Sequence, residues 1–272
     1  MYNELYNRVA LACCYITVFL GEEKVSDGTG FAYTPNGEVL TAAHVVTGRW
    51  PIREEDYKDK NQKIYCKFPH QPLAEYSVFF CSVGIDVAVF THRIQIDLAV
   101  LLPVIPFATP VPHIPAVAIP PNLGDEVFMA GFSEEVRLPF DFDKLLPHNF
   151  EGVPVFRAAI QRGYMADMTG PLFKRGFVGN IRRVVAENAS ASEQVECDVF
   201  YIDNSMNTGA SGGPVFNLRG EAVGVVSERA ITEVDKGENA MLKVPSGSTL
   251  AVSLAPLRYI SRMTGGAYRV GP

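Results

Sequence analysis

Short apolar runs separated by turn residues recur along most of the chain. Runs such as EYSVFFC, DVAVF and DLAVLL are rich in Val, Ile, Phe and Tyr, and they are too short for helices of ordinary length. A second set, which includes ECDVFYID and GEAVGVVS, follows in the later part of the chain. The pattern therefore predicts an all-β protein, and its length favours two packed β-units over one.

A proline-rich passage over residues 103–121 separates the two sets of strands. Proline lacks a backbone donor and is excluded from central strands, so this passage is predicted to be a connector. We accordingly expect an N-terminal unit over residues 1–112 and a C-terminal unit over residues 113–272. The second unit contains an insertion around residues 133–171, for which two interpretations stay open: a lid or exosite, or a surface segment without a role in chemistry.

Few segments have the pattern of a helix. A short helical turn is expected at AAHVV, a helix around Val155–Met165, and a short amphipathic C-terminal helix near Leu250–Ile260. The apolar stretch Val9–Leu20 is expected to be the first core strand, because acidic Glu4 precedes it and no small-x-small cleavage site follows it. It is also shorter than the roughly 20 apolar residues that cross a bilayer.

Composition narrows the range of partners. The chain has 272 residues, 47% of them hydrophobic and 20% charged, with a formal net charge of −6, so we expect no nucleic-acid partner. The five cysteines are an odd number without C-x-x-C spacing, which favours buried free thiols in a reducing compartment. Together with the missing leader, this predicts a cytoplasmic protein with no membrane partner. Since no metal-binding or nucleotide-binding motif occurs, neither a metal nor a cofactor is expected.

The segment GASGGP, residues 209–214, contains the strongest chemical signal. Glycines on both sides of Ser211 allow a tight turn that exposes its hydroxyl. The same turn is expected to point the amides of Gly209 and Ser211 into one concavity, where they would stabilise an oxyanion. Ser211 is therefore predicted to be a nucleophile.

A serine hydroxyl needs a neighbouring base to become a nucleophile. His44 lies in LTAAHVV, where small residues leave room for an imidazole beside a cleft. The other four histidines are expected to lie in loops or edge strands. No histidine follows Ser211, which argues against an α/β-hydrolase, and only Asp27, in a turn-like segment, precedes His44, which argues against the subtilisin order. The order His, Asp, Ser remains.

The segments GTGFAYTPNGEVLTAAHVV and GASGGPVFNLRGEAVGVVS resemble the histidine and serine segments of trypsin-like peptidases. A third segment, DLAVLL from Asp97, is similar to the strand that contains the family's triad aspartate. The resemblance implies a chymotrypsin-like fold of two six-stranded antiparallel β-barrels. It also implies a serine endopeptidase that cleaves polypeptides through a triad of Ser211, His44 and Asp97.

The acid of this triad has two candidates, because Asp86 begins a similar segment, DVAVF. The shorter span from Asp97 to the AGF segment is more similar to compact family members. Asp86, in turn, leaves a tidier count of six strands in the first unit. We favour Asp97 and keep Asp86 as the alternative.

The resemblance also suggests substrate-binding residues. It places Ser205 at the base of the primary pocket and Val226 and Ser227 in its wall. A neutral Ser205 argues against selection of Lys or Arg and favours an apolar or medium-sized side chain, while the effect of Glu228 stays undecided. Ala210 replaces the aspartate with which digestive members bind a new amino terminus, so we expect activity without propeptide cleavage, as in bacterial intracellular or Deg-type relatives but without their peptide-binding module.

Two other functions would suit the same sequence. One is a catalytically inactive binding protein that keeps the protease fold. The other is a serine esterase acting on small acyl substrates. All residue types of the triad are present, which favours the endopeptidase.

Overall fold

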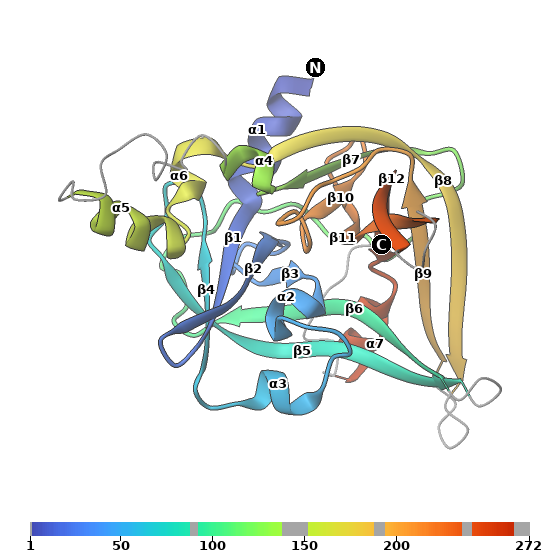
Figure 1. Cartoon of the computed structure of the whole chain (residues 1–272), viewed down its shortest axis with the longest axis horizontal. Coiled ribbons are helices and arrows are strands. Elements are labelled where there is room, and N and C mark those ends of the chain that lie inside the picture. The colour runs from blue at the N-terminus through green and yellow to red at the C-terminus, as the bar shows by residue number, and fades with distance from the viewer. Residues whose placement is uncertain (1, 88–91, 138–151, 188–193, 236–240, 264–272) are drawn as a thin grey trace.

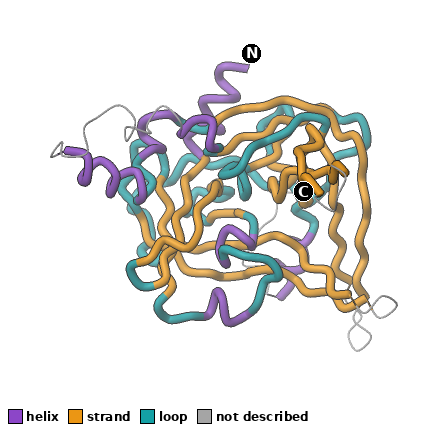
Figure 2. Tube along the Cα trace, in the orientation of Figure 1, coloured by secondary structure: helices purple, strands orange, loops and turns teal. Residues whose placement is uncertain are grey.

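A computed structural model describes residues 2–87, 92–137, 152–187, 194–235 and 241–263. Strands dominate the chain, as the orange segments in Figure 2 show. They form two closed barrels, each of six strands paired in antiparallel fashion. The all-β, chymotrypsin-like prediction is therefore confirmed. The centre of the predicted insertion, residues 138–151, lies outside the described residues.

The first barrel is closed by pairing between its first and fourth strands. Its order is β1-β2-β3-β6-β5-β4 (Figure 1). Inward-facing side chains from all around the barrel, among them Ile16, Phe31 and Leu40, are fully buried. The strands are β1 (Cys13–Leu20), β2 (Glu23–Ala32), β3 (Val39–Thr41), β4 (Gln62–Lys67), β5 (Ala74–Val87) and β6 (His92–Pro103).

The second barrel has the order β10-β11-β12-β9-β8-β7. Its own core includes Met129, Phe200 and Val215, each fully buried. The proline-rich connector between the barrels is mostly irregular and forms one isolated bridge, from Ala116 to Ala222. The strands are β7 (Glu126–Gly131), β8 (Leu172–Glu187), β9 (Gln194–Ile202), β10 (Pro214–Phe216), β11 (Ala222–Asp235) and β12 (Met241–Ser253).

The start of the chain differs from the prediction of a strand over Val9–Leu20. Residues Tyr2–Ala12 form a helix, α1, and the strand begins only at Cys13. The buried residues of α1 recur at helical spacing: Leu5, Val9 and Ala12. Tyr6 also stacks on Phe173 of the second barrel, with ring centroids 4.4 Å apart. Tertiary packing therefore selects a helix where the apolar run alone suggested a strand.

The other helices are short. They are α2 (Ala43–Thr47), α3 (Glu54–Lys58), α4 (Glu134–Arg137), α5 (Gly152–Gln161), α6 (Met165–Thr169) and α7 (Pro256–Met263). The C-terminal helix is confirmed, but it begins six residues later than Leu250, because the chain up to Ser253 pairs with β9 and β11. None of the helices that the structure describes is long and apolar enough to cross a membrane.

The insertion between β7 and β8 is anchored to the first barrel. Lys67 of β4 is 1% exposed, and its Nζ donates to Oδ1 of Asp167 in α6 at 2.6 Å. The backbone N–H of His70 donates to the same oxygen at 2.7 Å. Burial acts to raise the pKa of Asp167, but these two hydrogen bonds outweigh it and lower the pKa below its ordinary value. Part of the insertion is thus fixed by a buried charge.

All five cysteines are free and buried, so the prediction of buried free thiols is confirmed. Burial raises the pKa of both Cys81 and Cys197 to about 12. A thiol with so high a pKa carries almost no thiolate at neutral pH and is chemically inert. The thiols therefore contribute to packing.

Candidate active site

His44 lies at the start of α2, directly after β3. Ala42 and Ala43 are fully buried, so the turn that presents the imidazole packs tightly against the barrel. The carboxylate of Asp97, 2% exposed in β6, contacts His44 twice. Its Oδ1 accepts the backbone N–H of His44 at 3.0 Å, and its Oδ2 lies 2.8 Å from Nδ1. This double contact fixes both the position and the orientation of the ring.

The surroundings of His44 favour a basic imidazole. Burial acts to lower its pKa, since it disfavours the charged form. The hydrogen bond and the charge of Asp97 oppose this, and the charge of Glu228 adds to them. The pKa of His44 is raised above its ordinary value as a result. Such a ring can accept a proton and hold it.

The two candidate acids lie in the same β5–β6 hairpin, Asp86 on β5 and Asp97 on β6, at different distances from its end. Asp97 faces His44, whereas the backbone of Asp86 pairs with Arg93 nearer the end of the β5–β6 hairpin. The side chain of Asp86 lies outside the part of the chain that is described. The structure therefore brings Asp97 to the imidazole.

The loop around Ser211 has each of its peptide groups held in place. Gly209 has φ +90°, and a Cβ there would lie 2.6 Å from the carbonyl oxygen of Phe132, so this position requires glycine. Four carbonyl oxygens of the loop accept hydrogen bonds: Thr208 from Glu134 N at 2.8 Å, Gly209 from Thr29 Oγ1 at 2.8 Å, Ala210 from Gly213 N at 3.0 Å, and Ser211 from Thr29 N at 2.8 Å. Within the described residues, the amides of Gly209 and Ser211 have no protein acceptor.

Thr29 was not anticipated from the sequence. It is fully buried in β2 of the first barrel, yet it binds the loop of the second barrel through both its backbone N–H and its hydroxyl. Its Oγ1 also accepts the N–H of Phe132 at 2.9 Å. In the sequence, a threonine between two glycines looks the same as an ordinary turn residue, so no local signal marked Thr29.

Ser227 links the serine to the acid. Its Oγ donates to Oδ2 of Asp97 at 2.5 Å, and its carbonyl accepts the hydroxyl of Ser211 at 3.0 Å. The structure thus gathers Ser211, Ser227, Asp97 and His44 into one hydrogen-bonded group across the two barrels. In the structure as described, no hydrogen bond joins Ser211 Oγ to the imidazole, because the hydroxyl is turned toward Ser227.

The remaining predicted site residues lie beside this group. Val226 is buried, and its backbone exchanges hydrogen bonds with Gly212 at 2.7 Å and Gly213 at 2.9 Å. Ser205 lies before the serine loop, and its carbonyl accepts from Lys174 Nζ at 2.8 Å. The same Lys174 ammonium lies 3.6 Å from Oε2 of Glu135, so a neutral hydroxyl and a paired cation lie around Ser205.

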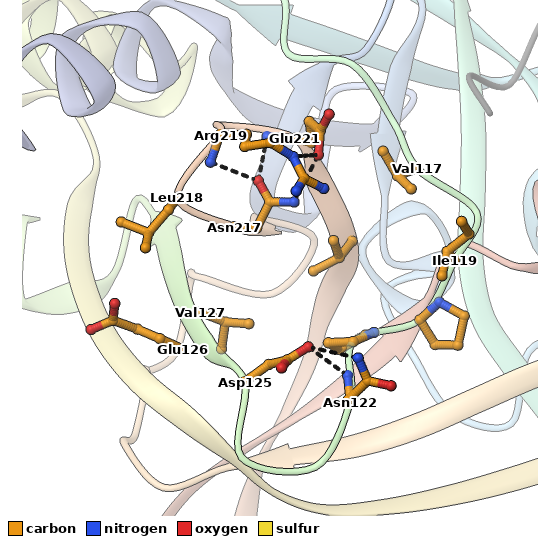
Figure 3. Close-up of a pocket in the computed structure, with 13 residues that line it drawn as sticks. Val117, Ile119, Asn122, Asp125, Glu126, Val127, Asn217, Leu218, Arg219 and Glu221 are labelled. Carbon is orange, nitrogen blue, oxygen red and sulfur yellow. Dashed lines mark hydrogen bonds and ion pairs between the residues drawn. The ribbon is translucent and has the colours of Figure 1, made fainter.

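A separate cavity of about 440 Å³ lies at the other end of β7, away from Ser211. Figure 3 shows that its polar side chains bind one another: Asn122 with Asp125, and Glu221 with Asn217 and Arg219. No group of three or more His, Cys, Asp or Glu side chains that could hold a metal occurs in the described part of the chain.

Comparisons with known proteins agree with this arrangement. The family model for a trypsin-like peptidase domain matches residues 28–225. The chain is similar in structure to the Rv3671c protease of M. tuberculosis in its active form, with a TM-score of 0.56, 18% identity, and coverage of 99% of this chain and 88% of that one. The chain is also similar to the Ser343Ala mutant of Rv3671c from M. tuberculosis H37Rv in an inactive form. The TM-score is 0.53, the identity is 17%, and the match covers 99% of this chain and 94% of that one.

The comparison with curated proteins finds no match. At these identities the solved structures support the fold, while the family model covers well over half of the chain and includes the segments around His44, Asp97 and Ser211. This chain belongs to the family of trypsin-like peptidase domains.

Proposed function

We propose that the protein is a serine endopeptidase that cleaves polypeptides through an acyl-enzyme intermediate. The observation that carries this proposal is the Ser211 group: a fixed His44–Asp97 pair from one barrel beside a serine loop with two unoccupied amides from the other. Acyl transfer needs these parts: a base, an orienting acid, a nucleophile and oxyanion donors. No metal or organic cofactor takes part in it.

Catalysis begins when the Ser211 hydroxyl leaves the Ser227 carbonyl and turns to His44 Nε2. As Oγ attacks the substrate carbonyl, His44 takes its proton, and Asp97 stabilises the resulting imidazolium. The amides of Gly209 and Ser211 receive the oxyanion. His44 then protonates the leaving amine, and water activated by the same ring releases the acyl group from Oγ.

The primary pocket is proposed to lie between Ser205 and Val226. Ser205 is neutral, and the Lys174 ammonium at its carbonyl is paired with Glu135 at 3.6 Å, so the base of the pocket supplies no net negative charge for a cation. An apolar or medium-sized side chain is therefore expected at the scissile residue. Ala210 offers no carboxylate to a new amino terminus, and the loop is already held by Thr29 and Glu134. We therefore expect activity without removal of a propeptide.

A fluorophosphonate probe tests this proposal. The wild type should be labelled at one site, found on Ser211 by peptide mass spectrometry, and Ser211→Ala and His44→Ala should not be labelled. Ser211→Ala should lower peptide kcat by about 10⁶-fold. A folded wild type that resists labelling and cleaves nothing would instead identify a binding protein, and turnover of esters without peptides would identify an esterase.

A further inference from the structure

A small cleft between the barrels opens next to the Ser211 group. Its volume is about 170 Å³, which is below the roughly 300 Å³ of pockets for drug-sized ligands and suits one side chain. Its lining includes Trp50 and Asp97 from the first barrel and Val199, Ser227, Glu228 and Leu250 from the second. The cleft therefore touches the residues that link His44 to Ser211.

The two carboxylates that line this cleft differ in their partners. Asp97 is 2% exposed and already binds His44 and Ser227. Gln95 uses both ends of its amide on the backbone of Ile52, at 2.6 and 2.7 Å. Among the described residues that line the cleft, Glu228 is the one charged side chain with neither an ion pair nor a hydrogen bond, and it is exposed. The cleft thus offers a negative charge that lacks a counterion.

Trp50 supplies an aromatic wall beside that charge. Its ring stacks on the imidazole of His44, with centroids 6.1 Å apart and planes 26° apart, and 39% of the residue stays exposed. Apolar side chains of Val199 and Leu250 complete the lining. A long side chain with an apolar stem and a cationic end fits such a site, since the stem packs on apolar surface while the cation contacts carboxylate and ring.

We propose that this cleft binds a Lys or Arg side chain of the polypeptide substrate, from a residue that precedes the scissile bond. Glu228 is the counter-charge and Trp50 the aromatic wall. The proposal rests on the proposed peptidase function and names a substrate class for it.

We place the residues that precede the scissile bond along β11. With the scissile residue against Val226, the strand leads through Ser227 to Glu228. An extended peptide that runs antiparallel to this strand carries its preceding residues past Ser227 into the cleft. The cationic preference is therefore expected at a position on the amino side of the bond, distinct from the primary pocket at Ser205.

Cleavage-site profiling tests the proposal. The wild type digests a mixed peptide library, cleaved bonds are identified by mass spectrometry, and matched peptides with Lys, norleucine or Glu at the preferred position are then assayed. Rates are expressed per site titrated with fluorophosphonate. We expect Lys to exceed norleucine in kcat/KM by about five- to thirtyfold, as one ion pair and one cation–π contact allow. In Glu228→Gln this ratio should fall toward one, and in Glu228→Lys the Glu peptide should become preferred.

The matched control is Glu22→Gln, which removes an equal charge from the exposed β1–β2 turn and should keep the wild-type ratio. A wild type that cleaves peptides without a cationic preference, or a preference that survives in Glu228→Gln, would overturn the cleft proposal and leave the peptidase intact. A wild type that cleaves no peptide would overturn the proposed function itself.

Discussion

The serine loop and the insertion at residues 133–171 are both contacted across the barrel boundary, but by different means. The loop is held through neutral hydrogen bonds from Thr29 to two of its carbonyls. The insertion is held through a charge, the buried Lys67 ammonium bound to Asp167. Hydrogen bonds to backbone fix the orientation of peptide groups, whereas an ion pair with one buried partner, here Lys67, fixes a whole segment, and leaving that buried charge unpaired is costly. The first should govern chemistry and the second stability.

After the nucleophile itself, the largest effect is expected at the acid. Asp97→Asn keeps the shape of the side chain but removes the charge that holds the imidazole, so kcat should fall by about 10⁴-fold. Asp86→Asn is the matched variant in the same hairpin and should retain activity. Peptide hydrolysis by the two purified variants measures this. Loss of activity in Asp86→Asn alone would transfer the role of the acid to that residue.

Thr29→Val tests whether the serine loop is positioned across the barrels. Valine suits a β-strand, but it leaves the Gly209 carbonyl and the Phe132 N–H without their hydrogen-bond partner. We therefore expect kcat to fall by about 10- to 100-fold, with a smaller change in KM. Thr29→Ser keeps the hydroxyl and should restore most of the rate. Steady-state kinetics and the rate of fluorophosphonate labelling should fall together. Equal loss in both variants would point to a packing defect instead.

Asp167→Asn tests the insertion. The change leaves the Lys67 ammonium, 1% exposed, without its counter-charge, and should lower the free energy of unfolding by about 3 kcal/mol. Because Asp167 shares no hydrogen-bond partner with the Ser211 group, kcat/KM should stay within about twofold. Denaturant unfolding and peptide assays measure the two quantities. Glu55→Gln, which breaks an exposed pair, should change stability little. A large loss of activity would show that the insertion acts as a lid.

The smallest effect is a shift of the pH profile. Only the neutral imidazole is a base, so kcat/KM rises with pH through the pKa of His44, and the raised pKa places this acidic limb above the ordinary value of 6.5. Glu228→Gln removes one of the charges that raise it, so the limb should move to lower pH on an uncharged substrate. Salt should shrink the difference, since Glu228 is exposed. A limb that moves upward would contradict this account.

The sequence predicted those parts of the site whose chemistry is local. The glycines around Ser211 and the small residues before His44 prescribe backbone geometry that any neighbours would have to accept, and the structure shows both turns. Thr29 and the hydroxyl of Ser227 acquire these contacts only when the barrels meet, so no local pattern marks them. The same reason explains α1, where packing on Phe173 decides between helix and strand.

Detection of the acyl-enzyme is the most direct test of the central claim. The wild type is mixed with an activated ester at acidic pH, quenched within milliseconds to seconds, and measured by intact mass and by peptide mapping. The account predicts one added acyl group, on Ser211, that forms far more slowly in His44→Ala. Ester turnover with no acyl group on the protein, or with the group on another residue, would contradict it.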